Sequence, residues 1–214
     1  MIKNKRIKLF SIIILLLLIA SKGGWAAMQI DMAGFNMLPP HCQARYAEMY
    51  KKGQVEGIVI NPEKYQPELW EKRVGHATFI HFHHYCGALK LLNDLKFGKY
   101  KTALEKNKLM EQVSSNIKYT IEHSKLDTQN AWVLAEAHLK LAEFEELVNK
   151  NDDAVNLYKK SIEINPRYIQ AYAGLSDIYK KMGMNSEAKA VLEKAIKIKP
   201  NSKGLLKRLA KLEK

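Results

Sequence analysis

The chain has 214 residues, a length that suits one or two small domains with a sizeable hydrophobic core. It is strongly basic, with 35 lysine and arginine residues against 22 acidic ones and a formal net charge of +13. Such a charge suits acidic proteins, phospholipid headgroups or nucleic acid. The export signal at the start of the chain excludes nucleic acid as an expected partner.

Residues 1–26 have the pattern of a secretory signal peptide. A basic start is followed by an apolar stretch, Leu9 to Ala20, and then by small residues before a cleavage site after Ala26. The apolar stretch is short for a membrane span, which needs roughly 20 residues. Cleavage would remove five basic residues, lower the charge to +8 and leave a periplasmic protein. Because Lys22 interrupts the approach to this site, an uncleaved inner-membrane anchor stays open as the alternative.

Residues 27–67 read as an irregular N-terminal appendage that packs on the helices that follow. The prolines at 39 and 40 cannot continue a helix but can precede one, which the pattern predicts over 43–52. Residues 55–60 have the composition of a short strand or extended segment. Asn61-Pro62 and Gln66-Pro67 are turn signals.

Residues 68–125 predict two long antiparallel helices. Apolar residues recur at helical spacing from Glu68 to Leu95, and Gly98 ends this first helix. The second helix is expected from Tyr100 to about Ser124. A second pair follows over 129–166, beginning near Trp132 and continuing with a helix over 152–164.

The segment 167–200 has the clearest pattern in the chain. Pro166 and Pro200 stand 34 residues apart, and the apolar positions between them recur at helical spacing on either side of Gly183. The large, small and aromatic positions are Tyr172, Leu175, Ser176, Tyr179, Gly183, Ala188, Leu192 and Ala195. In spacing and residue type this segment resembles a tetratricopeptide repeat, whose period is about 34 residues.

The resemblance implies an all-α fold, in which antiparallel helix hairpins stack into a right-handed superhelix, an α-solenoid. Residues 167–200 form one repeat. Residues 129–166 resemble a lengthened copy with about six extra residues around 145–151, and 68–125 a degenerate one. Residues 201–214 are expected to be a basic capping helix, because a solenoid needs a polar-backed end for solubility.

In this family the first helix of each repeat lines a concave groove that binds partner proteins. Carrying the groove positions onto this chain predicts one set of partner-binding residues. They are Asn130, Val133, Ala137 and Lys140 in the lengthened repeat, Gln170, Ala173, Asp177 and Lys180 in the clear repeat, and Lys207 and Lys211 in the capping helix. The expected partners are other envelope proteins or extended peptide segments.

Motifs of catalysis are absent from the sequence: it has no glycine-rich phosphate loop, no nucleophile elbow and no His-Glu-x-x-His. The chain is therefore expected to be a non-catalytic scaffold or adaptor without a cofactor. A further hypothesis is tethering to a membrane surface, through an uncleaved N-terminus and the basic C-terminal helix.

The two cysteines, Cys42 and Cys86, leave two interpretations open. In an exported chain an even count favours a disulfide, here closing a long loop between the appendage and the first long helix. The alternative is a metal- or haem-handling protein, in which copper, zinc or haem is bound by the histidine-rich run over 76–86. Its candidate ligands are His41, Cys42, His76, His83, His84 and Cys86. The two interpretations compete, because a cysteine in a disulfide cannot donate a thiolate.

Overall fold

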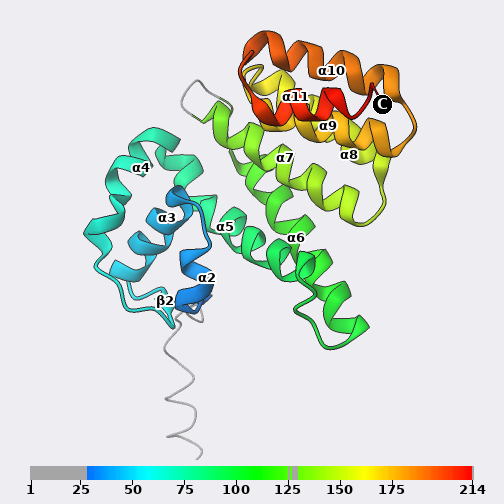
Figure 1. Cartoon of the computed structure of the whole chain (residues 1–214). Coiled ribbons are helices and arrows are strands. Elements are labelled where there is room, and N and C mark those ends of the chain that lie inside the picture. Colours follow the sequence, from blue (N-terminus) through cyan, green and yellow to red (C-terminus); the bar gives the residue numbers. More distant parts are fainter. Residues whose placement is uncertain (1–27, 125, 127–129, 214) are drawn as a thin grey trace, which may run out of the picture.

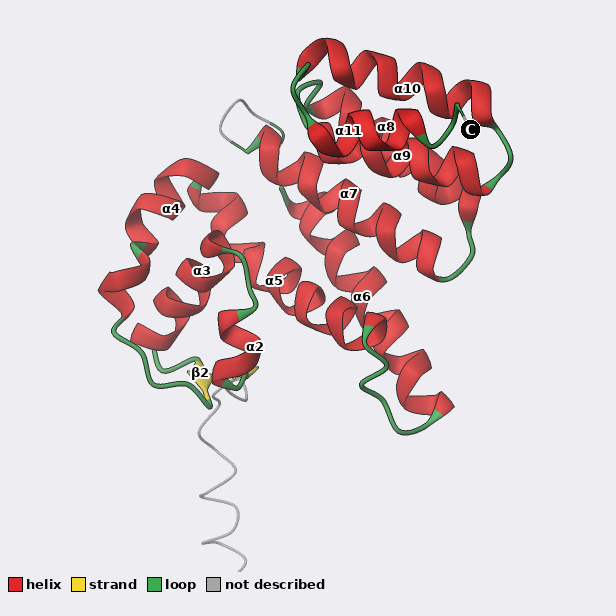
Figure 2. Ribbon diagram, viewed as in Figure 1, coloured by secondary structure: helices red, strands yellow, loops and turns green. Residues whose placement is uncertain are grey.

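The computed structural model describes residues 28–124, 126 and 130–213. Helices make up nearly all of this part of the chain (Figure 2), which confirms the all-α prediction. Its strands are two short ones that pair in parallel, β1 (Met28–Gln29) with β2 (Val55–Glu56). No helix within the described ranges is long and apolar enough to cross a membrane. The signal peptide expected over 1–26 lies outside the described residues.

The appendage is more helical than expected, with α2 (Met32–Asn36), α3 (Pro40–Lys51) and the 3-10 helix η1 (Pro62–Tyr65). Asp31 caps α2 by accepting a hydrogen bond from the backbone N–H of Gly34 at 2.6 Å. Pro40 occupies the first turn of α3, where a missing N–H costs nothing. These elements pack on the following helices rather than form a separate domain.

The long helix expected over 68–95 is wrong as a single element. It is two helices, α4 (Pro67–Val74) and α5 (His76–Lys96), separated by Gly75. Gly75 has φ +85° and ψ 136°, a conformation that L side chains rarely adopt and that no helix continues through. The apolar spacing runs across the break because both helices bury one face, so the periodicity alone did not reveal it.

The helix α6 (Ala103–His123) returns antiparallel to α5, close to the predicted bounds. Thr102 caps it by accepting from the N–H of Glu105 at 3.1 Å. The Glu105 carboxylate accepts in turn from the N–H of Lys101 at 2.7 Å, as in a capping box. The α5–α6 hairpin is the longest in the molecule, and its tip points away from the C-terminal helices (Figure 1).

Five helices follow: α7 (Ala131–Leu147), α8 (Asn151–Ile164), α9 (Ile169–Lys181), α10 (Asn185–Ile198) and α11 (Lys203–Ala210). The pairs α7–α8 and α9–α10 are hairpins, and α11 packs at the C-terminal end of the stack (Figure 1). We call residues 28–124 the N-terminal unit and 131–213 the repeat unit.

The two hairpins of the repeat unit are in register at 34 residues through the turn. Helix α7 ends at Leu147 and α9 at Lys181, and α8 and α10 both begin and end 34 residues apart. Asn149 (φ +62°) occupies the left-handed turn position that Gly183 (φ +78°) occupies in the next repeat. The six extra residues expected around 145–151 are therefore absent. The added length is at the other end: the offset from Ile169 falls at position 135, and α7 begins four residues earlier, at Ala131.

The cores of the two units differ in size. One large core joins the appendage to α5, α6 and part of α7, whereas the repeat unit contains two smaller clusters between consecutive helices. Cys42 of α3 and Cys86 of α5 form a disulfide within the large core, with an S–S distance of 2.09 Å, and both are fully buried. The predicted bridge is confirmed.

Candidate functional site

The candidate site is a groove lined by α7, α9 and α11, the first helices of successive repeats. The predicted positions on α9 are Gln170, Ala173, Asp177 and Lys180. The 34-residue register observed in the structure places their counterparts on α7 at Glu136, Leu139, Glu143 and Glu146. On α11 the counterparts are Gly204, Lys207 and Lys211.

Two adjoining pockets follow this line of residues. The first, of about 410 Å³, is lined from α7 by Leu139, Glu143 and Glu146 and from α9 by Gln170, Ala173 and Asp177. The second, of about 390 Å³, is lined by Asp177, Lys180, Lys207 and Lys211, with Arg208. The six residues predicted on α9 and α11 therefore lie together along one surface.

The residues predicted on α7 do not share that surface. Val133 and Ala137 are fully buried in the large core, and Asn130 is 1% exposed and donates from Nδ2 to the Thr78 hydroxyl at 3.0 Å. Their assignment to the groove is wrong, because α5 and its neighbours cover this face of α7. Lys140 is half-buried and pairs with Glu143 at 2.9 Å.

The sequence did contain a signal for the correct positions. Counting 34 residues back from the second helix and the turn, rather than aligning on Trp132, selects Glu136, Leu139, Glu143 and Glu146. Asn149 concealed this register, because it stands where the family pattern has glycine. Asparagine is one of the few other residues that adopts a left-handed conformation readily.

The floor of the groove depends on a close approach between α8 and α9. A Cβ on Gly174 would lie 2.3 Å from the ring of Tyr158, so any side chain at this position would collide with the ring. The Tyr158 hydroxyl donates to the Glu146 carboxylate at 3.1 Å. Burial, together with the nearby Glu146 carboxylate, raises the pKa of Tyr158, so the tyrosine stays a neutral donor.

The charge of the groove changes sign along its length. The α7 end is acidic, and Glu143 is held between Lys96 Nζ (2.6 Å) and Lys140 Nζ (2.9 Å). Burial acts to raise the pKa of Glu143, but the two lysines outweigh it and the pKa is lowered, so this carboxylate is ionised. Burial raises the pKa of Glu136, at the far acidic end.

The α11 end of the groove is basic. Arg208 Nε donates to both carboxylate oxygens of Asp177 at 3.0 Å, which removes the acidic charge of α9 from this end. Lys207 and Lys211 are exposed, and neither forms an ion pair with any residue that the structure describes. Two free ammonium groups therefore lie at this end.

The N-terminal unit extends the groove beyond α7. A third pocket, of about 300 Å³, lies between the loop before α3, helix α5 and helix α7. Its walls are apolar, from Leu38, Leu89 and Leu92 among others, and Glu136, Lys96 and Lys140 stand at its polar side. Sequence reasoning missed this extension, because the loop and α7 lie some hundred residues apart in the chain.

Behind this pocket His41 is enclosed by aromatic rings. Its ring centroid lies 5.2 Å from that of Trp132, 5.3 Å from Phe82 and 5.8 Å from Trp70. Burial lowers the pKa of His41 to about 4, although its Nε2 lies 3.8 Å from a carboxylate oxygen of Glu136. The imidazole is therefore neutral at neutral pH and serves as a packing residue between the two units.

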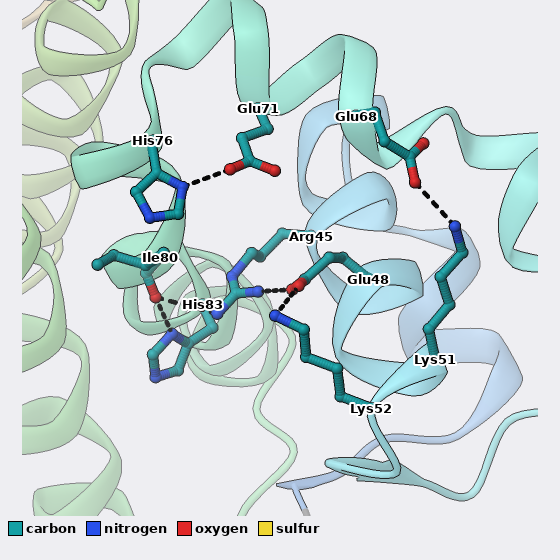
Figure 3. Close-up of polar contacts among 9 residues, drawn as sticks. All are labelled: Arg45, Glu48, Lys51, Lys52, Glu68, Glu71, His76, Ile80 and His83. Atoms are coloured by element: carbon teal, nitrogen blue, oxygen red, sulfur yellow. Dashed lines mark hydrogen bonds and ion pairs between the residues drawn. The ribbon is translucent and has the colours of Figure 1, made fainter.

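The metal and haem alternative is contradicted. Cys42 and Cys86 are joined to each other, so neither offers a thiolate. His76 pairs with Glu71, and His83 Nδ1 donates to the Ile80 carbonyl at 2.9 Å (Figure 3). His84 Nδ1 bonds the Asn116 side chain at 2.9 Å, and His41 lies apart in its aromatic enclosure. Within the described ranges no group of three or more histidine, cysteine, aspartate or glutamate side chains is placed to hold a metal ion.

Residues 148–212 match the tetratricopeptide repeat family. No curated protein sequence matches the chain significantly. A structure similar to this one is TTC0263, a thermophilic TPR protein from Thermus thermophilus, with 18% identity and a TM-score of 0.52 over 81% of this chain and 79% of that one. At this identity the likeness shows the fold, a helical-repeat solenoid.

Two further similar structures have lower TM-scores. The second TPR domain of human RPAP3, solved with an HSP70 peptide, is 19% identical, with a TM-score of 0.42 over 51% of this chain and 85% of that one. MamA is 17% identical, with a TM-score of 0.43 over 72% of this chain and 84% of that one.

Proposed function

We propose, from the premise that residues 148–212 are tetratricopeptide repeats, that this protein is a scaffold that holds an extended segment of a partner protein in the groove of α7, α9 and α11. The observation that carries the proposal is the continuous line of accessible side chains on the first helix of each repeat. Small residues at Ala173 and Gly204 leave room for a backbone to approach the floor. Binding, and no chemistry of its own, is the role proposed for the chain.

The charge distribution indicates what kind of segment the groove would accept. Lys207 and Lys211 suit acidic side chains at the α11 end, whereas Glu136 and Glu146 suit a basic or hydrogen-bond-donating group at the α7 end. The apolar pocket beside Leu38, Leu89 and Leu92 would accept an apolar side chain near that basic end. A segment that runs from basic and apolar to acidic therefore matches the groove in one direction only.

We further propose that the protein works in the cell envelope, in the periplasm after cleavage at Ala26, or anchored to the inner membrane if residues 1–26 are retained. Two observations support an exported protein. The first 26 residues have the pattern of a signal peptide. The Cys42–Cys86 disulfide is a bond that persists in oxidising compartments. The mass of the exported chain distinguishes cleavage from retention.

Site-specific photo-crosslinking tests the groove. A photoreactive amino acid at Ala173, on the groove floor, should yield a crosslinked partner in the native envelope, and the same group at Ala190, exposed on α10, should not. The crosslinked partner then serves as the probe for affinity measurements.

Charge reversal with a matched control tests the direction of the groove. Lys207→Glu with Lys211→Glu should weaken binding of that partner roughly tenfold, since each exposed charge pair contributes about 0.2–1 kcal/mol. Lys194→Glu with Lys197→Glu makes the same charge change on exposed residues of α10 and should leave the affinity unchanged. Equal crosslinking at Ala173 and Ala190, or equal loss in both charge variants, would show that the groove is not the binding site.

A further inference from the structure

The tip of the α5–α6 hairpin is exposed in a way that the fold does not require. Residues 96–108 are exposed except for Tyr100, which is half-buried. Phe97 is 67% exposed and Leu104 is 80% exposed. The tip lies at the free end of the hairpin, at the lower right of Figure 1, and points away from α9, α10 and α11.

Helix α6 begins well before it meets the core. Its first buried residue is Val113, so residues 103–108 project beyond the packed part of the helix and are exposed all round. A large aromatic and a leucine placed there contribute nothing to burial, and apolar area kept in water is unfavourable. The conformation of the tip comes instead from the Thr102 cap and from Gly98, whose φ is +65°.

Lysines surround these two apolar side chains. Over residues 96–108 there are five lysines and one acid, Glu105. Glu105 is engaged by the backbone N–H of Lys101, and Lys106 Nζ lies 5.6 Å from the centroid of the Tyr100 ring. Lys96 and Lys99 pair with Glu143 and Asp94. The side chains of Lys101 and Lys108 form no ion pair with any residue that the structure describes.

We propose that this tip binds the surface of an anionic phospholipid bilayer. Phe97 and Leu104 would enter the boundary between headgroups and acyl chains, and Lys101, Lys106 and Lys108 would contact the phosphate groups. This is the arrangement by which apolar side chains and lysines bind an anionic membrane together. Lysine stems are long enough to lie along the apolar boundary while the ammonium groups stay in water.

The shape and position of the tip favour a bilayer over a protein partner. The apolar side chains stand on a narrow convex end, interspersed with cations, rather than in a flat or hollowed patch of the kind that protein interfaces use. A bilayer accepts such a tip without a complementary shape. Because the tip points away from the repeats, a chain bound in this way would leave the groove of α7, α9 and α11 accessible. The inference therefore goes beyond the proposed function and can fail independently of it.

A fluorescent label at the tip tests the proposal in the full chain. The only two cysteines of the sequence are joined to each other, so Phe97→Cys introduces a unique reactive thiol. With vesicles of phosphatidylcholine and phosphatidylglycerol, an environment-sensitive label there should shift to the blue and be quenched by brominated lipid. It should do so weakly with phosphatidylcholine alone and less at high salt. The matched control is Val59→Cys, 87% exposed on the N-terminal unit, whose label should stay in water.

Binding by variants separates the two components of the proposal. Phe97→Ser with Leu104→Ser should weaken vesicle binding at least roughly tenfold, because two apolar side chains leave the bilayer. Each of Lys101→Gln, Lys106→Gln and Lys108→Gln should weaken it roughly fivefold. Val59→Ser should have no effect. All these residues are exposed, so far-UV circular dichroism should show unchanged helicity.

Several results would overturn the proposal. One is a label at position 97 that stays in water although the chain binds vesicles, since residues 1–26 or α11 would then be the attachment. Others are serine variants that bind vesicles like the native chain, or a label that shifts only when a protein partner is added.

Discussion

The N-terminal unit and the repeat unit are both helical, yet they are held together in different ways. The N-terminal unit has one core rich in large aromatic residues, crossed by a disulfide and containing the buried histidine His41. The repeat unit has small clusters between consecutive helices, and close approaches at small residues such as Gly174, Ala188 and Ala195. In the first, residues distant in sequence depend on one another; in the second, each hairpin depends on its neighbour.

The difference explains where the candidate site can be. Repetition at 34 residues places equivalent side chains of α7, α9 and α11 along one line, so the groove follows from the repeat. Where the N-terminal unit meets α7, it buries Val133 and Ala137 and adds a pocket of its own beside Glu136. The irregular unit therefore decides where the groove begins.

Removing the disulfide should have the largest effect on the contrast between the units. Cys42→Ala with Cys86→Ala opens a loop between residues 44 apart, and the chain-entropy estimate for a loop of this size is about 4 kcal/mol. Hydrogen exchange should show lost protection in α3 and α5, and unchanged protection in α9 and α10, which share no core with the bridge. Equal loss in both units would show that they unfold as one.

Lowering the pH should weaken the N-terminal unit next. The unfolded chain binds a proton at His41 with the ordinary pKa of 6.5, whereas the folded chain does so only near 4. Stability should fall as the pH drops from about 6.5 to about 4, by about 3 kcal/mol. Glu136 acts in the opposite sense, because burial raises its pKa and protonating it favours the folded state.

A pair of variants isolates the contribution of His41. Urea unfolding followed by tryptophan fluorescence reports on the site, since Trp70 and Trp132 both pack on His41. His41→Phe should flatten the decline between pH 6.5 and pH 4, whereas His76→Gln, at an exposed position, should retain it. An identical pH dependence in native and His41→Phe chains would contradict the assignment.

Two matched glycine substitutions should give smaller effects of opposite sign. In the repeat unit Gly174→Ala places a methyl group 2.3 Å from the Tyr158 ring and should cost about 2 kcal/mol through overpacking. In the N-terminal unit a Cβ on Gly87 meets its nearest atom, the Tyr46 hydroxyl, at 3.9 Å. Gly87→Ala should therefore stabilise α5 by up to about 1 kcal/mol through helix propensity. Urea midpoints measure both, and a stabilising Gly174→Ala would refute the close approach.

Much of the repeat unit could be predicted from the residues alone, and the site could be predicted in part. The spacing between Pro166 and Pro200 set the period, and the groove positions on α9 and α11 lie where that period places them. The positions on α7 were misassigned, because alignment on Trp132 ignored the turn at Asn149. The break at Gly75 was missed because the apolar period continues through it.

Local chemistry was enough to determine the helices, the repeat period, the pairing of the two cysteines and the basic character of α11. Helical spacing, caps and turn residues act over a few positions, and a chain with two cysteines has a single intramolecular pairing. Only the tertiary structure decided which face of α7 stays accessible, how His41 is enclosed, and that Phe97 and Leu104 remain in water. These properties depend on which distant segments cover a residue, and no local pattern encodes that cover.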